Sequence, residues 1–315
     1  MRRLTLYKLD VPYRESMRIE GFEFGNPDAS VTCSIVGSTR GDEVQQAYIG
    51  ACIVNRLTQL EERGRMANDA RVLVIPCANP LSMNVGNRFW PTDRTDINRL
   101  FPGAVHGTTT ERVAAGIFSA VRDSTYGIQL ASFNQQGDFI PHIRVMRTGE
   151  ISDEALRLAV DFRMPCVVER VPDDYDKGTL NYVWQTWGTH AFSLYSQTTD
   201  RIDHTSANKA VAATTRFLTA RKILRGRMSG GVDSISFVDT QLVNVRTEES
   251  AGYLESHVKP GDSVKRGQEL GVVLDAFDAH VRERLIAPTD GVVFFCRVKD
   301  LVQQRMVVFR IAPEL

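Results

Sequence analysis

Short apolar runs alternate with longer amphipathic segments from about residue 28 to about residue 222. The short runs are rich in β-branched residues and predict strands at 31–37, 71–78, 127–133, 140–145, 166–171 and 191–196. The longer segments carry apolar residues at helical spacing and predict helices at 43–62, 110–121, 152–162 and 205–224. Strands that alternate with helices predict an α/β sheet with helices on its faces. In such folds, ligands are expected in the loops that follow the strands.

The helical pattern stops near residue 225, and a turn-rich segment, Met-Ser-Gly-Gly-Val-Asp-Ser, follows at 228–234. Beyond it, Pro-Gly-Asp at 260–262 and Arg-Gly at 266–267 separate short apolar runs, which is typical of hairpins. We therefore predict an α/β domain over residues 1–225 and a smaller all-β domain over residues 226–315.

Residues 258–271 and 286–293 of this second domain resemble the biotinyl/lipoyl carrier fold. In that fold, a lysine on a hairpin tip takes the cofactor through an amide bond. The intervening stretch, 270–284, contains no lysine, so it offers no amine for that bond. We therefore expect a packing and oligomerisation module that carries no cofactor.

Composition and charge exclude several classes of partner. Lys plus Arg and Asp plus Glu number 38 each, so no net field favours nucleic acid or an anionic membrane. No apolar stretch approaches the roughly 18 residues of a membrane span, and the N-terminus does not read as a secretory signal. The five cysteines are widely spaced and form no Cys-x-x-Cys pair, which favours free thiols in a reducing compartment. We expect a cytoplasmic protein.

A long polar loop with several arginines follows the second predicted strand. Arg88 and Arg99 can clamp a carboxylate through bidentate hydrogen bonds, with Asn98 orienting one of its oxygens. The alternative is that the arginines only attach the loop to Asp93 and Asp96. The residues alone leave both interpretations open.

This loop resembles the substrate-binding signature of the succinylglutamate desuccinylase/aspartoacylase family, which is related to zinc carboxypeptidases. The matching residues are Asn-Pro at 79–80, Arg88, and Asp-x-Asn-Arg-x-Phe-Pro-Gly at 96–103. The resemblance extends over roughly residues 28–315, because a similar β-module also closes the chain in that family. It implies a carboxypeptidase-like mixed sheet flanked by helices, and roles for Arg88, Asn98 and Arg99 in binding the substrate's carboxylate and polarising its carbonyl.

The resemblance also implies a zinc site, but this sequence departs from the family's metal motifs. The family has His-Gly-Asp-Glu after the first strand, where residues 40–43 read Arg-Gly-Asp-Glu, so only Glu43 stands. It has Asp-Leu-His after a later strand, where residues 129–131 read Gln-Leu-Ala. The family's catalytic glutamate aligns with Tyr195. We therefore expect no zinc and no other cofactor.

Each replacement has a chemical consequence. The guanidinium of Arg40 repels a dication, and Ala131 has no donor atom. Tyr195 has an ordinary pKa of about 10, a poor match to a general base near neutral pH. Arg40 and Glu43 are three residues apart at a predicted helix start, and we hypothesise that the guanidinium takes the metal's place beside Glu43. His142 is a weak candidate for a rebuilt metal site.

Three functions remain open from the sequence. The first is a pseudoenzyme that binds a small carboxylate-bearing ligand, such as an N-acyl amino acid or a peptide end, without hydrolysis. The second is an active amidohydrolase that acts through rebuilt residues. The third is a scaffold subunit that pairs with an intact homologue. As partners we expect the small carboxylate-bearing ligand and either a second copy of this chain, in a homo-oligomer, or an intact homologue. Loss of both histidine ligands favours the first and third over the second.

Overall fold

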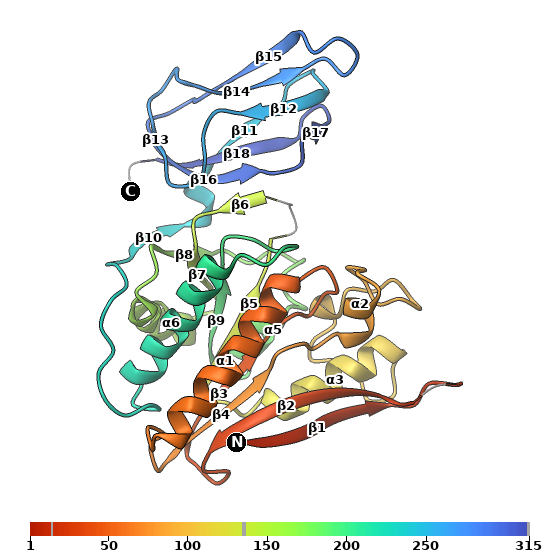
Figure 1. The fold of residues 1–315 in the computed structure, drawn as a ribbon, viewed down its shortest axis with the longest axis vertical. Helices are drawn as coiled ribbons and strands as arrows, with labels where there is room; N and C mark the ends of the chain where they lie inside the picture. The colour runs from red at the N-terminus through yellow and green to blue at the C-terminus, as the bar shows by residue number, and fades with distance from the viewer. Residues whose placement is uncertain (14, 134–136, 314–315) are drawn as a thin grey trace. The chain divides into compact units, whose positions relative to one another are not determined.

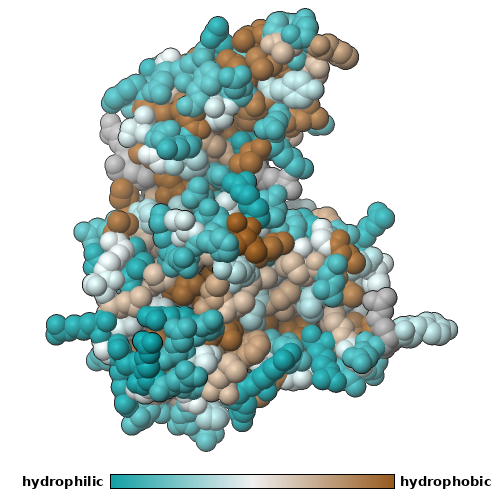
Figure 2. Space-filling model, in the orientation of Figure 1, coloured by the Kyte–Doolittle hydropathy of each residue, from teal (hydrophilic) through white to brown (hydrophobic). Residues whose placement is uncertain are grey.

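The computed structural model describes residues 1–13, 15–133 and 137–313. Its contacts divide the chain into two compact units, one of Met1–Ser132 and His142–Ser234 and the other of Phe133–Pro141 and Ile235–Leu315. Each unit has its own apolar core. Hydrophilic and hydrophobic residues are interspersed on the face drawn in Figure 2. Among the described residues, no helix is both long and apolar enough to cross a membrane.

The first unit is built on a mixed sheet (Figure 1) whose strands lie in the order β1-β2-β4-β3-β5-β9-β7-β8. Three neighbouring pairs, β4–β3, β3–β5 and β5–β9, are parallel. The pairs β1–β2, β2–β4 and β9–β7 are antiparallel. The strand bounds are β1 Arg2–Leu9, β2 Met17–Gly25, β3 Val31–Val36, β4 Ala70–Ile75, β5 Tyr126–Ala131, β7 His142–Met146, β8 Cys166–Arg170 and β9 His190–Tyr195.

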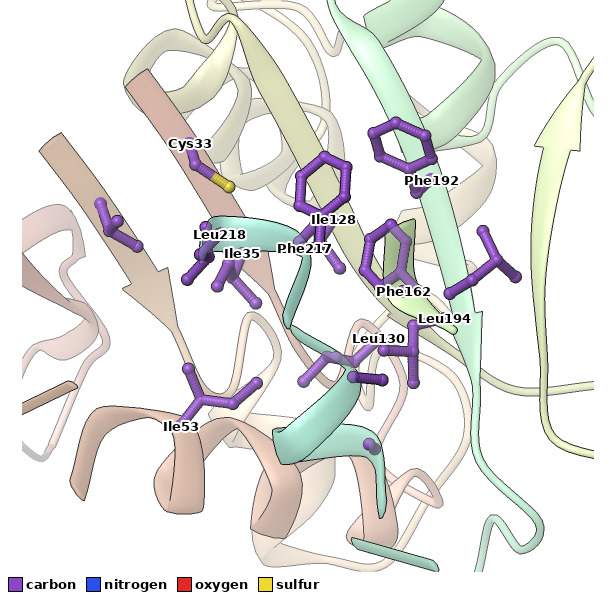
Figure 3. Close-up of a cluster of buried hydrophobic side chains, with 14 of the residues drawn as sticks. Cys33, Ile35, Ile53, Ile128, Leu130, Phe162, Phe192, Leu194, Phe217 and Leu218 are labelled. Carbon is purple, nitrogen blue, oxygen red and sulfur yellow. The ribbon is translucent and has the colours of Figure 1, made fainter. Parts of the chain in front are cut away.

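Helices cover both faces of this sheet, because successive strand residues point to opposite sides and both sides are apolar. One face packs against α1, α4 and α6, and Figure 3 shows part of that core, in which Phe162, Phe192 and Phe217 are in mutual contact. The other face packs against α3 and α5. The helix bounds are α1 Val44–Glu62, α2 Pro80–Asn84, α3 Thr109–Val121, α4 Glu150–Ala159, α5 Leu180–Thr186 and α6 His204–Ala220, with 3₁₀ turns η1 Ile97–Arg99 and η2 Val160–Phe162.

The second unit is formed by antiparallel strands around a core of Val, Leu, Ile and Phe side chains. One of its sheets has the order β11-β18-β16-β13 with β6 paired to β16, and the other has the order β15-β14-β12-β17. The bounds are β6 Gly137–Phe139, β10 Ile235–Val238, η3 Asp239–Gln241, β11 Val243–Arg246, β12 Gly252–Ser256, β13 Ser263–Val264, β14 Glu269–Leu274, β15 Val281–Ile286, β16 Gly291–Arg297, β17 Leu301–Val302 and β18 Val307–Ala312.

The predicted α/β architecture with a β-rich C-terminal part is confirmed, and several boundaries are corrected. The strand predicted at 71–78 ends at Ile75, because β4 is hydrogen-bonded on both sides and Pro76 has no N–H to donate. The strand predicted from 140 begins at His142, since residues 133–141 belong to the second unit. The hairpin of β1 and β2 and the short helix α5 were not predicted.

Candidate functional site

Arg40 and Glu43 lie in the loop that joins β3 to α1, with only 3% and 1% of their surfaces exposed. The pairing expected from their spacing is present: Nη1 of Arg40 donates to Oε1 of Glu43 at 3.2 Å. Nε of Arg40 also donates to both carboxylate oxygens of Asp96, at 2.9 and 3.1 Å. Burial acts to lower the pKa of Arg40, but attraction to Glu43 and Asp96 outweighs it and holds the pKa above its ordinary value. The guanidinium is therefore a fixed, buried charge.

The Glu43 carboxylate is fully engaged by neighbouring donors. Besides Arg40, its oxygens accept from Oγ of Ser132 at 2.6 Å, from the backbone N–H of Arg40 at 3.0 Å and from Oγ1 of Thr39 at 3.3 Å. Glycine is needed just before it at Gly41, because a Cβ there would lie 2.2 Å from the backbone of Ser82 and Asn87. The loop thus holds Glu43 as an acceptor whose lone pairs are already used.

The end of β5 carries the second altered motif. Gln129 donates from Nε2 to Oδ1 of Asn98 at 2.9 Å, and Oδ1 also accepts from the backbone N–H of Leu180. Because Oδ1 is committed to these two donors, the Asn98 amide has a fixed orientation, and its Nδ2 donates no hydrogen bond among the described residues. Ala131 presents only a methyl group beside Tyr195, its register partner on β9.

Acidic and basic side chains alternate along this site in the order Glu43, Arg40, Asp96 and Arg99. Arg99 lies 4.0 Å from Asp96 and 3.8 Å from Asp176, donates to the carbonyl of Tyr175, and its guanidinium is 5.0 Å from the centre of that ring. Burial is the first cause that lowers the pKa of Arg99, and the positive charge of Arg40 adds to it. The side chain remains 21% exposed, so Arg99 is the accessible member of the series.

Arg88 has a different partner from the one the sequence offered. It pairs with Asp42 at 3.2 Å. Asp93, the residue proposed as an anchor for the arginines, instead accepts from the N–H of Thr95 and from the hydroxyl of Thr110. The attachment of the arginines to Asp93 is therefore wrong, whereas attachment to Asp96 holds for Arg99.

Tyr195 lies at the end of β9 and is 2% exposed. Its ring stacks on His142 of β7, with 4.6 Å between ring centres and 6° between planes. The guanidinium of Arg144, also on β7, is 4.7 Å from the centre of the same ring. Burial raises the pKa of Tyr195 above its ordinary value, so its phenol stays protonated near neutral pH and is not a general base.

The donors at this site do not fit a tightly bound zinc ion. Arg40 is a cation, Ala131 has no donor atom, and the Glu43 carboxylate is already hydrogen-bonded on both oxygens. In the part of the chain that the structure describes, the group of three metal-type side chains with close ligand atoms is Asp275, Asp278 and His280, in the second unit. Structural and catalytic zinc need three or four such ligands together.

Several residues of the site were missed from the sequence, among them Ser132, Arg144 and, beside Arg99, Asp176. Ser132 directly follows the altered motif at 129–131, but a serine after a strand is an ordinary loop residue and carries no signal. Arg144 lies within the strand predicted at 140–145, two positions from His142. That spacing places both side chains on one face of a strand, so an arginine inside an apolar strand was the available signal.

Comparisons with known proteins identify the family and the fold. The profile of the Succinylglutamate desuccinylase/Aspartoacylase catalytic domain matches residues 29–220. N-alpha-acetyl-L-2,4-diaminobutyric acid deacetylase of Halomonas elongata is 26% identical over 253 residues, which cover 78% of this chain and 70% of that protein.

Two crystal structures share the fold. A succinylglutamate desuccinylase from Silicibacter sp. TM1040 has a TM-score of 0.83 at 18% identity, over 98% of this chain and 92% of its own. A succinylglutamate desuccinylase/aspartoacylase from Rhodobacter sphaeroides has a TM-score of 0.81 at 17% identity, over 98% and 94%. At these identities the two structures show only that the fold is shared. The family assignment rests on the profile match, which covers more than half of the sequence. The chain belongs to the succinylglutamate desuccinylase/aspartoacylase family, whose members include N-acyl-amino-acid deacylases.

Proposed function

We propose that this protein binds the carboxylate of an N-acyl amino acid, or of a peptide end, and does not hydrolyse its amide bond with zinc. The observation that carries the proposal is the buried guanidinium of Arg40 between Glu43 and Asp96. In the resemblance to the family's metal motif, Arg40 takes the place of the first histidine ligand, so the proposal assigns to this guanidinium the positive charge that a metal ion would otherwise supply. The guanidinium neutralises Glu43 without providing a Lewis acid or a bound water.

Arg99 is the residue best suited to receive the ligand's carboxylate. Its two acidic neighbours lie at 3.8 and 4.0 Å, beyond ordinary hydrogen-bond distance. Part of its planar fork therefore remains available for a bidentate carboxylate. Arg88 lies in the same loop segment, and its 22% exposed side chain already pairs with Asp42. We assign Arg88 a supporting role.

Asn98 provides the neutral donor of the proposed pocket. Its Oδ1 is fixed by Gln129 and by the backbone of Leu180, which directs Nδ2 toward a ligand's carbonyl oxygen. An amide held in one orientation needs no reorganisation on binding, so its hydrogen bond contributes more to affinity. The relative from Halomonas elongata is named for an N-acetylated amino acid, which supports this ligand class.

Two measurements on the purified wild-type protein test the proposal. Metal analysis is expected to find zinc far below one equivalent per chain. Heat denaturation with a panel of N-acetyl and N-succinyl amino acids is expected to show a rise in Tm. At a ligand concentration about 100 times Kd, the free energy of unfolding rises by about 2.7 kcal/mol.

Arg99→Gln is expected to abolish the Tm shift. Arg157→Gln is the matched control, since Arg157 is exposed on α4 and, among the residues that the structure describes, pairs only with Glu154 of the same helix. Stoichiometric zinc together with amide hydrolysis would contradict the proposal and favour an active deacylase. The absence of any ligand-induced shift, with co-purification of an intact homologue, would favour the scaffold function.

A further inference from the structure

Arg144 lies in the middle of β7 and faces the same side of the sheet as Gln129 of the altered motif at 129–131. Strand β7 pairs with β9 so that Arg144 is opposite Ser193, and β5 pairs with β9 so that Gln129 is opposite the same Ser193. Residues in register on neighbouring strands point to the same face. Arg144 therefore shares a face with Gln129, which positions Asn98.

The charge of Arg144 has no acidic partner among the described residues. Its Nε is buried and makes no hydrogen bond within the described part of the chain, and its guanidinium is instead 4.7 Å from the centre of the Tyr195 ring. The neighbouring arginines differ: Arg40, Arg99 and Arg170 each pair with one or more aspartates or glutamates. The side chain of Arg144 as a whole is half-buried, so an anion supplied from outside the chain can reach its guanidinium and provide the missing counter-charge.

The positive charge of Arg144 also reaches the proposed binding residue. Burial is the main cause that lowers the pKa of Arg99, and repulsion from Arg40 and from Arg144 acts in the same direction. Two cations that repel each other across a partly exposed region attract a ligand with more than one negative group. The ring of Tyr195 supports Arg144 through a cation–π contact.

We propose that Arg144 is a second anion-binding residue of this pocket and selects ligands that carry a second carboxylate. This inference rests on the proposed function and deepens it: Arg99 receives one carboxylate, and Arg144, held over the Tyr195 ring, receives the other. A ligand with an ammonium group at that place would meet the guanidinium and be repelled. The pocket therefore differs in charge preference from a site for an acetylated diamino acid, the kind of compound for which the Halomonas relative is named.

Isothermal titration with N-acetyl-L-glutamate and N-acetyl-L-glutamine tests the inference, because the two ligands have the same shape and differ in one charge. Wild type is expected to bind the glutamate compound roughly 10- to 100-fold more tightly, the range for a hydrogen bond to a charged group. Arg144→Gln is expected to bring the two affinities close together and to leave binding of the glutamine compound unchanged. Arg99→Gln is expected to weaken both.

The absence of a charge preference in wild type would overturn the inference without any variant, even if both compounds bind. Equal weakening of both compounds by Arg144→Gln would also overturn it, since that result indicates a structural role. Should Arg144→Gln fail to fold, Arg144→Lys keeps the charge but loses the fork, and it is expected to retain only part of the preference. A full preference in Arg144→Lys would also support the inference, since it would show that the positive charge at this position makes the selection, whereas loss of the preference in Arg144→Lys would overturn it.

Succinate separates this inference from the proposed function. If wild type binds neither acyl amino acid, the proposed function fails. Succinate binding that Arg144→Gln abolishes would still support the second anion-binding residue. If wild type binds neither the acyl amino acids nor succinate, both the proposed function and this inference are overturned.

Tyr195 provides an independent readout of the cation–π contact. Tyr195→Phe keeps the ring and is expected to keep the charge preference, whereas Tyr195→Leu removes the ring and is expected to reduce it several-fold. Equal loss in both variants would show that the hydroxyl, and not the ring, is responsible, and would contradict the role assigned to the ring.

Discussion

Arg40→Met removes the cation that pairs with Glu43, at the start of α1, and with both carboxylate oxygens of Asp96. Methionine fills a similar volume but donates no hydrogen bond, so the change isolates the charge and its contacts. Glu43 then keeps only Ser132, Thr39 and a backbone N–H as donors, and Asp96 loses both of its contacts to Nε. The protein must then fold with an uncompensated carboxylate in its interior.

The structure sets the size of the effect. The side chains of Arg40 and Glu43 are 4% and 1% exposed, and that of Asp96 is 14% exposed, so solvent screens the interaction little. Breaking a buried pair by removing one partner costs about 3–5 kcal/mol. Arg147, whose pair with Glu169 has a 56% exposed arginine, is the control, and Arg147→Met should cost less than about 1 kcal/mol.

Urea unfolding followed by tryptophan fluorescence measures this change in the first unit alone, because all three tryptophans, Trp90, Trp184 and Trp187, belong to it. Adding Glu43→Gln to Arg40→Met should recover about 1–3 kcal/mol, since it removes the uncompensated charge. If Arg40→Met changes the free energy of unfolding by less than about 1 kcal/mol, or if the second substitution makes the loss larger, the reasoning about a buried, mutually neutralised pair is wrong.

Two further predictions concern the loop and the thiols. Gly178→Ala should lower the free energy of unfolding by about 1–3 kcal/mol and weaken ligand binding, because a Cβ there would lie 2.1 Å from the carbonyl oxygen of Arg99. Urea unfolding measures the first effect and isothermal titration the second, and an unchanged Kd would refute the link to Arg99. Burial raises the pKa of Cys166 and of Cys296 to about 12, so at about pH 8 roughly one in 10⁴ of either thiol is ionised. Alkylation followed by mass spectrometry should label both only after unfolding, and rapid labelling in the folded state would contradict their burial.

The sequence by itself determined the main elements of the first unit and the family. Apolar residues at strand and helix spacing predicted the order of the main elements from β3 to α6, without the short helices α2 and α5, because burial on a sheet or helix face requires that spacing. The signature at 79–103 and the replacements at Arg40 and Ala131 were readable as well. They depend only on which chemical groups stand at which positions, and a guanidinium or a methyl group has the same ligand chemistry in any fold.

Only the tertiary structure decided the partners. Asp96 beside Arg40, Ser132 beside Glu43 and Arg144 over Tyr195 join residues from separate elements. Their distances depend on strand order and register, in particular on the antiparallel insertion of β7 beside β9. Local periodicity constrains which face a residue takes, but it does not say which strands are neighbours. The pairing of charges across that face is therefore a property of the folded sheet.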